Sequence, residues 1–170
     1  MRKLLVLLII IFLVSCGYTT RGFLYDGYKI KIKPVENKIN ITSEDRKYSG
    51  YTSFPILIEN RLTNEIVTKF NIDGGLKVVN EDPEALSLTC TVDDYKKETV
   101  RYTDNDDVEE QRLRLYVNII LVDSSGKELI KKTVVGESTY FINRASEESA
   151  QIELIDDAAR RIVEAVAEAW

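Results

Sequence analysis

Apolar and polar residues alternate along several stretches of the chain, and strict alternation is typical of a strand with one buried face. Between residues 28 and 33, Tyr28, Ile30 and Ile32 alternate with lysines. The sequence predicts strands over residues 28–33, 76–79, 85–102, 108–122 and 128–141, with a polar loop over residues 36–53. The buried face of the last strand stays undecided, because the adjacent residues Val134 and Val135 compete for it.

An acidic segment, residues 104–107, separates the two longest predicted strands and is typical of a hairpin turn. A turn centred between residues 105 and 106 pairs positions whose numbers sum to about 211, which sets Cys90 opposite Leu121 on the apolar face. Nearer the turn the same register opposes polar to apolar residues. We therefore expect a bulge near residues 93–94 that turns Tyr95 to the buried face.

Two further segments carry apolar residues about four positions apart, the spacing that gives a helix one buried face. The first helix is expected to begin at Pro55, where a first-turn proline forgoes no helical hydrogen bond, and to end at residues 73–75. Its buried stripe consists of Ile58, Leu62, Ile66 and Phe70, widened by Val67. The second helix is capped by Ser146 and has acidic residues in its first turn. Its expected buried stripe consists of Ile152, Ile155, Ala159, Ile162, Val163 and Val166.

These elements predict an α+β fold, because each helix and each long strand has a single apolar face to bury. The simplest arrangement is a two-layer sandwich, with two helices packed on one face of a mixed four- to five-stranded sheet. The strand–helix–strand start favours a parallel pair of strands, whereas the later hairpins are antiparallel. Apolar residues make up 44% of the chain, so residues 28–170 are expected to form a single domain.

The N-terminal segment has the organisation of a secretory signal. Arg2 and Lys3 precede an uninterrupted apolar run over residues 4–14, which is too short to span a membrane. The run closes on Ser15 and Cys16 and resembles the bacterial lipobox, so we expect cleavage before Cys16 and acylation of its sulfur; the alternative is a transmembrane helix. Residues 1–15 are then a signal peptide and residues 16–27 a lipidated tether. Gly17, where retention at the inner membrane usually requires aspartate, favours the outer membrane.

Composition excludes several classes of function. Without residues 1–15 the chain has 21 basic and 28 acidic residues, a net charge of about −7, so nucleic acid is not an expected partner. The sequence has no histidine, which removes the commonest general base and the commonest metal ligand. Cys90 is in phase with apolar neighbours and is interpreted as buried, and residues 104–107 lack the glycine and glutamate of a calcium loop. We therefore expect no enzymatic activity, no metal and no cofactor.

One set of basic residues is a candidate for binding an anionic lipid. Arg112 and Arg114 share the polar face of a predicted strand, and the predicted register sets Lys97 opposite Arg114. Like charges this close on a sheet destabilise each other unless an anion lies between them. Arginine forks match phosphate groups such as those of lipid A. The other interpretation is that these charges are solvated and neutralised by acids such as Asp104 and Glu110.

A second basic set lines one face of the first predicted strand. Lys29, Lys31 and Lys33 alternate with its apolar residues. They are either a binding surface or the charges of an edge strand, which block mispairing with another chain.

Short segments with a few characteristic residues occur in order along the mature chain. They are residues 16–18 with 21–22, 58–62, 76–79, 112–115, 121–123 with 126–127, 148–150 and 162–170. In this order, and together with the lipobox, they resemble the LptE family, the lipopolysaccharide-assembly lipoproteins of Gram-negative outer membranes. The resemblance spans essentially the whole mature chain, although each segment alone is unspecific.

The resemblance implies the same two-layer sandwich and a role at the outer membrane. It implies a lipid-anchored protein on the periplasmic face that enters the lumen of the large barrel protein LptD. There it acts as a plug, helps the barrel to assemble and assists insertion of lipopolysaccharide into the outer leaflet. The expected partners are an LptD-type barrel, lipopolysaccharide and the membrane. The alternative is a periplasm-facing glycolipid-binding lipoprotein without a stable barrel partner; a hydrolase is a third hypothesis, for which no catalytic dyad is found.

Overall fold

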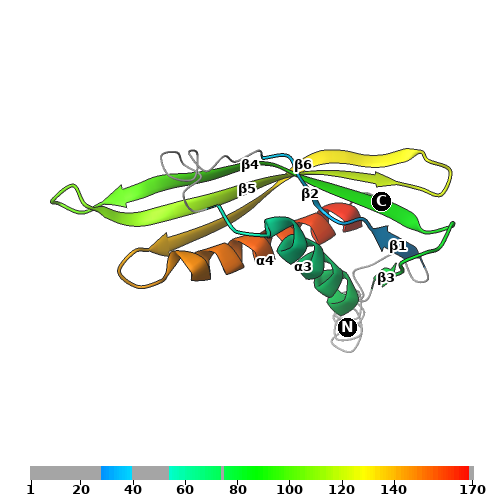
Figure 1. Cartoon of the computed structure of the whole chain (residues 1–170), viewed down its shortest axis with the longest axis horizontal. Coiled ribbons are helices and arrows are strands. Elements are labelled where there is room, and N and C mark those ends of the chain that lie inside the picture. The colour runs from blue at the N-terminus through cyan, green and yellow to red at the C-terminus, as the bar shows by residue number, and fades with distance from the viewer. Residues whose placement is uncertain (1–27, 40–53, 74, 169–170) are drawn as a thin grey trace, which may run out of the picture.

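The computed structural model describes residues 28–39, 54–73 and 75–168 (Figure 1). Its elements are β1 (Lys29–Ile32), β2 (Glu36–Asn37), α3 (Ile58–Asp73), β3 (Lys77–Val78), β4 (Leu86–Tyr102), β5 (Val108–Val122), β6 (Glu128–Phe141) and α4 (Glu147–Ala167). The signal peptide, the acylated Cys16 and the tether predicted for residues 1–27 lie outside the described residues. Within the described ranges, no helix combines the length and apolar character needed to cross a membrane.

The strands form one mixed six-stranded sheet in the order β3-β1-β4-β5-β6, with β2 also paired to β4. β1 and β2 run parallel to β4 at successive positions along it, and β3 runs parallel to β1. β4, β5 and β6 follow one another as antiparallel hairpins, so the predicted mixed sheet is confirmed. The loop predicted from residue 36 onward was wrong at β2, where the Lys38 N–H donates to the Val92 carbonyl at 3.0 Å. Both β2 side chains are exposed, so no apolar alternation marks the strand.

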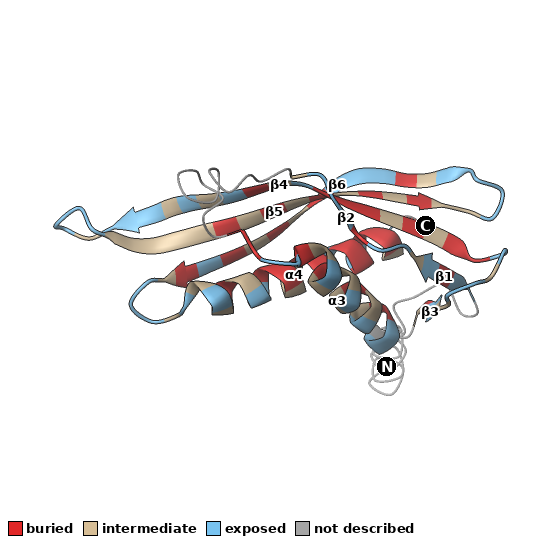
Figure 2. Ribbon diagram, viewed as in Figure 1, coloured by how far each residue is buried: buried red, intermediate tan, exposed pale blue. Residues whose placement is uncertain are grey.

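Both helices pack on the same face of this sheet, and no described helix covers the other face (Figure 1). Figure 2 shows the buried residues concentrated where the helices meet the strands. The sheet contributes Leu113, Leu115, Val117, Ile119 and Leu121 of β5, and α3 contributes Ile58, Leu62, Ile66 and Phe70, each at most 1% exposed. The predicted two-layer α+β sandwich is therefore confirmed.

The bulge expected near residues 93–94 is confirmed, because the register of β4 against β5 shifts between Val92 and Asp94. Beyond the shift Tyr95 is buried at 3% exposure. The predicted register itself was wrong by two residues, since Cys90 pairs with Ile119 rather than with Leu121. A shift of two residues keeps every side chain on its face, so the apolar pattern alone does not distinguish the two registers.

The buried face of β6, which its sequence leaves undecided, follows from its contact with α4. Ile130, Val134 and Tyr140 are buried on the helix side. Gly136 lies between them, and a Cβ atom at this position would come within 2.6 Å of the Ala158 Cβ. Strand and helix therefore approach closely only because both residues are small.

The start of α3 differs from the prediction by three residues. The helix begins at Ile58 rather than at Pro55, because Leu57 adopts a left-handed backbone conformation with φ of 53° that interrupts the helical geometry. The end at Asp73 agrees with the predicted stop at residues 73–75.

The cap of α4 is confirmed, and its buried stripe is partly confirmed. The Ser146 side chain accepts a hydrogen bond from the Ser149 N–H at 3.1 Å. Ile152 was wrongly assigned to the buried stripe, since it is 54% exposed, whereas Leu154 is fully buried. The other predicted stripe residues are all buried. Ile152 is in helical phase with the buried Ala159 and Val163 but lies near the start of α4, so helical spacing alone gives no sign of its exposure.

Candidate functional site

The sheet face without helices, called the open face below, carries alternate side chains of β4, β5 and β6. Its central residues are Asp94, Lys96 and Glu98 on β4, Arg112, Arg114, Tyr116 and Asn118 on β5, and Thr133, Val135, Glu137 and Thr139 on β6. The register aligns these residues in rows across the three strands, such as Lys96, Arg114 and Glu137. The prediction that Arg112 and Arg114 share the polar face of the sheet is confirmed. The open face is predominantly polar and charged at its centre.

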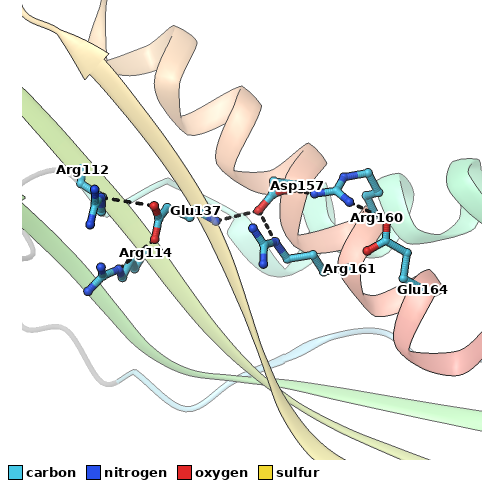
Figure 3. A network of polar contacts seen from close by, with 7 residues as sticks. All are labelled: Arg112, Arg114, Glu137, Asp157, Arg160, Arg161 and Glu164. Carbon is cyan, nitrogen blue, oxygen red and sulfur yellow. Dashed lines mark hydrogen bonds and ion pairs between the residues drawn. The ribbon is translucent and has the colours of Figure 1, made fainter. Parts of the chain in front are cut away.

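A single carboxylate lies between the two arginines. Glu137 Oε2 accepts a hydrogen bond from Arg114 Nε at 3.0 Å, and Glu137 Oε1 lies 3.2 Å from Arg112 Nε (Figure 3). The second contact is an ion pair without hydrogen-bond geometry, because Arg112 Nε is buried and has no hydrogen-bond partner. Glu137 therefore satisfies one arginine well and the other incompletely.

Arg114 also contacts a carboxylate from the neighbouring strand β4. Its Nη1 lies 3.0 Å from Glu98 Oε2. The hydrogen bond to Glu137 is the main reason that the pKa of Arg114 is raised above its usual value, and the charge of Glu98 adds to it. The arginines are thus paired with acids, which agrees with the interpretation that their charges are neutralised by nearby carboxylates. The acids that contact them are Glu98 and Glu137, whereas the expected Glu110 contacts Arg101 at 3.5 Å.

The structure does not bring Lys97 together with the arginines. Lys97 pairs with Leu113 on the helix side of the sheet, where its Nζ donates to Glu147 Oε2 at 2.8 Å. The predicted pairing of Lys97 with Arg114 was wrong, because Lys96 is the residue opposite Arg114. The bulge at residues 93–94 shifts the register by one residue, and a one-residue shift moves a side chain to the other face. Lys96 therefore replaces Lys97 beside the arginines.

Ion pairs and cation–π contacts continue along the open face on either side of the arginines. Lys96 Nζ lies 3.6 Å from Asp94 Oδ2 and 5.2 Å from the ring centre of Tyr116. Toward the β4–β5 turn, the guanidinium groups of Arg101 and Arg144 lie 5.7 and 5.2 Å from the ring centre of Phe141. Each cation named here has a partner, so the open face is an alternating charge surface rather than a purely basic patch.

The backbone of Glu137 is fixed from the helix layer. Its N–H donates to Asp157 Oδ2 at 2.9 Å, and Asp157 in turn accepts hydrogen bonds from Arg160 and from Arg161 Nε, the latter at 2.7 Å (Figure 3). Burial alone would raise the pKa of Asp157, but the hydrogen bonds from the Glu137 backbone and from both arginines together lower it. Figure 3 shows these residues as one polar network that reaches from the open face to α4, where Arg160 meets Glu164.

The lysines of the first strand are not a charged edge. β1 lies between β3 and β4, so the edge-strand interpretation was wrong. Lys29 Nζ donates to Asp82 Oδ2 at 2.5 Å, and this hydrogen bond raises the pKa of Lys29. Lys31 and Lys33 are exposed. Tyr28, assigned to the apolar face of this strand, is 53% exposed because β1 begins one residue later.

Glu137, Glu98 and Asp157 were missed by reasoning from the sequence. The turn over residues 123–126 predicts pairs whose numbers sum to about 249, whereas β5 and β6 pair at a sum of 251 because the register shifts between Leu121 and Val122. The method applied to residues 104–107 would therefore have set Val135 opposite Arg114; it finds the face of Glu137 but not its partner. Asp157 has no such signal, because its contact depends on how α4 crosses β6.

The described residues hold no group of three or more potential metal-binding acids and cysteines. Cys90, predicted to be buried, is fully buried, and burial raises the pKa of its thiol to about 12, so it stays protonated near neutral pH. On the helix side, the Tyr140 hydroxyl donates to Gln111 Oε1 at 2.7 Å, and burial, with the nearby Glu147, raises its pKa to about 12. Neither the Cys90 thiol nor the Tyr140 hydroxyl is poised for nucleophilic or acid–base chemistry near neutral pH.

Comparison with known proteins gives one family and several similar structures. The family model described as LptE, lipopolysaccharide-assembly, matches residues 38–166. A hypothetical protein from Chlamydia trachomatis superimposes with a TM-score of 0.59 at 10% identity, over 82% of this chain and 95% of that one. An uncharacterized lipoprotein B from Nitrosomonas europaea has a TM-score of 0.53 at 15% identity, over 82% and 83% of the two chains. Rare lipoprotein B from Shewanella oneidensis has a TM-score of 0.49 at 16% identity, over 81% and 93%.

At these identities, the likeness to the Chlamydia trachomatis and Nitrosomonas europaea proteins establishes a shared fold. No curated protein matches the sequence significantly.

Proposed function

Because the chain belongs to the LptE lipopolysaccharide-assembly family, we propose that it is a lipid-anchored protein of the outer membrane that plugs and helps assemble an LptD-type barrel. In this role it assists the insertion of lipopolysaccharide into the outer leaflet. The family is non-enzymatic, which agrees with a site built for binding. The anchor is proposed to be acylated Cys16, with the domain on the periplasmic side and in the barrel lumen.

The observation that carries this proposal is the asymmetry of the sandwich. Two helices bury one face of the sheet (Figure 2). The other face presents paired charges. The lumen of an outer-membrane barrel is polar, in contrast to its lipid-facing exterior. A plug therefore needs a polar, well-folded surface rather than an apolar one, and the open face supplies it.

Co-purification tests the barrel partnership directly. The full-length chain with a C-terminal tag is isolated from gently solubilised outer membranes, and the proteins retained with it are identified by mass. We expect a large barrel protein at an amount comparable to the tagged chain. Isolation of the mature chain by itself would contradict the proposal.

The arginine pair favours a second candidate function, a glycolipid-binding lipoprotein that acts without a stable barrel partner. Arg112 and Arg114 lie on one open surface, and arginine forks suit phosphate groups. This alternative predicts that Arg112→Ala with Arg114→Ala abolishes lipopolysaccharide binding and leaves barrel maturation unchanged. A double variant that impairs barrel maturation favours the plug.

The proposed anchor has its own test. Substitution of Cys16→Ala removes the sulfur that would carry the acyl chains, so the precursor is expected to stay uncleaved or to leave the membrane. Fractionation followed by mass measurement of the N-terminus distinguishes these states. Normal processing and retention in the variant would remove the lipobox interpretation.

A further inference from the structure

Glu137 occupies the position between Arg112 and Arg114 that an anionic ligand group would take. We propose that Glu137 is an internal competitor, whose carboxylate lowers the affinity of the arginine pair for phosphate monoesters. The inference deepens the proposed function and rests on it for the source of the ligand, a phosphorylated glycolipid. The chemistry itself requires only a phosphate monoester.

The first support is the incomplete fit of Glu137 to the two arginines. Its hydrogen bond to Arg114 Nε is well formed at 3.0 Å, whereas Arg112 Nε is buried beside Glu137 without any hydrogen bond. A planar carboxylate has two oxygens, and here only one of them has a good donor. A phosphate monoester presents three oxygens in a tetrahedral arrangement, which allows it to accept from both guanidinium groups at once.

The second support is that the backbone of Glu137 is held in place by contacts that do not involve its side chain. The backbone N–H is held by Asp157 at 2.9 Å, and the preceding residue, Gly136, is packed directly against Ala158. The strand therefore stays in place when the carboxylate leaves the arginines. Displacement requires only rotation of the Glu137 side chain toward solvent, where its exposed fraction is already 36%.

The charge of the ligand decides how readily it displaces Glu137. A singly charged group, such as a phosphodiester or a carboxylate, replaces Glu137 by an equivalent charge and gains little. A phosphate monoester carries between one and two negative charges near neutral pH, so it binds the two arginines more strongly than Glu137 does. Glu98 lies 3.0 Å from Arg114 Nη1 and is also the cross-strand neighbour of Arg112, so a second carboxylate lies beside the arginine pair whether or not Glu137 is displaced.

The test compares Glu137→Gln with the wild type as full-length protein in detergent. The probes are lysophosphatidic acid, which ends in a monoester, lysophosphatidylglycerol, which carries only a diester, and inorganic phosphate. Dissociation constants come from the shifts of the arginine Nε–H resonances in NMR titrations. Glu164→Gln is the matched control, because it removes the same charge from the same polar network without contacting Arg112 or Arg114.

Glu137→Gln is expected to bind lysophosphatidic acid about five- to tenfold more tightly than the wild type, because the occluded state no longer competes. The preference for monoester over diester should be about the same in this variant, because competition by Glu137 lowers the affinity for both ligands by the same factor. Glu164→Gln is expected to match the wild type. If Glu137→Gln also binds inorganic phosphate more tightly than the wild type, the phosphate group itself is the ligand. If only lysophosphatidic acid binds more tightly, the ligand is a lipid headgroup. Both results support the competitor.

Equal or weaker binding of lysophosphatidic acid by Glu137→Gln would overturn the inference. Should this variant fold poorly in a thermal unfolding control, Glu137→Asp replaces it. The shorter side chain competes less well for the two arginines, so Glu137→Asp should bind lysophosphatidic acid more tightly than the wild type, and an affinity equal to wild type would overturn the inference. Co-purification with the barrel is measured on the same proteins. If the wild type does not co-purify with a barrel, the proposed function is wrong. If it does, and Glu137→Gln binds lysophosphatidic acid no more tightly, only the competitor inference is wrong.

Discussion

The two faces of the sheet are built from alternate residues of the same strands, yet they differ in what holds them together. On β5 the helix-side residues Leu113 and Leu115 are fully buried, whereas the open-face side chains of Arg112 and Arg114 remain 31% and 28% exposed. The helix side contributes burial of apolar area, which dominates folding stability. The open face contributes charge pairs, whose net contribution near solvent is small. Stability and recognition are thus assigned to opposite faces and should respond separately to mutation.

The largest expected effect is the loss of a buried side chain on the helix side. Leu115→Ala should lower the free energy of unfolding by about 2–5 kcal/mol, because it removes buried methyl groups and leaves a cavity under the helices. Thr139→Ala on the open face, an exposed position, should change it by less than about 0.5 kcal/mol. Urea unfolding monitored by circular dichroism measures both. Similar losses in the two variants would abolish the distinction between the faces.

The next effect concerns the contact between the layers. Gly136→Ala introduces a Cβ atom within 2.6 Å of the Ala158 Cβ, so strand and helix have to move apart, at a cost of about 1–3 kcal/mol. Ala158→Gly restores space, and the double variant should recover part of this loss. Thermal unfolding of the two single variants and the double variant measures the coupling. If the unfolding free-energy changes of the two single variants add up to that of the double variant, the two residues do not clash directly.

A smaller effect should appear at acid pH. The folded-state pKa of Asp157 is lowered, so its contribution to stability is present above the unfolded pKa of about 4 and is lost as pH falls through the folded value. Asp157→Asn should lower stability at neutral pH on the order of 1 kcal/mol. It should also flatten the decline in stability below about pH 4. Unfolding curves across this pH range test the prediction, and an unchanged pH dependence in the variant would count against it.

A small effect on stability is expected at the arginine pair. Arg114→Ala should leave the free energy of unfolding nearly unchanged, because its ion pairs with Glu98 and Glu137 lie near solvent. Binding of phosphorylated lipid to the same variant should fall well below that of wild type. Parallel measurements of unfolding and binding sharpen the comparison. A variant that unfolds readily and binds normally would reverse the roles assigned to the two faces.

The fold could be predicted from the sequence because its determinants are local and periodic. The alternation in β4 and β5 indicates their lengths and their buried faces, and the phase change beyond Val92 reveals the bulge that buries Tyr95. The exact register could not be predicted, since a shift of two residues preserves the pattern. β2 was missed because backbone hydrogen bonds to β4 form it, not buried side chains.

The site was less accessible to sequence reasoning than the fold. Arg112 and Arg114 were identified because they share a strand and a face. Lys97 was assigned to the wrong face, because the expected bulge was not carried into the pairing of the residues beyond it. Asp157 was missed because only the packing of α4 against β6 brings it to the Glu137 N–H.

The central claim is that the open face is enclosed by a partner while the helix face holds the fold together. Substituted-cysteine labelling tests it most directly, with Thr139→Cys placing a thiol on the open face opposite Arg112. The native Cys90 is buried and contributes no background. Labelling should be slow in intact outer membranes and fast in the purified protein. Equally fast labelling in both states would show that the open face is bare in the membrane and would contradict the account.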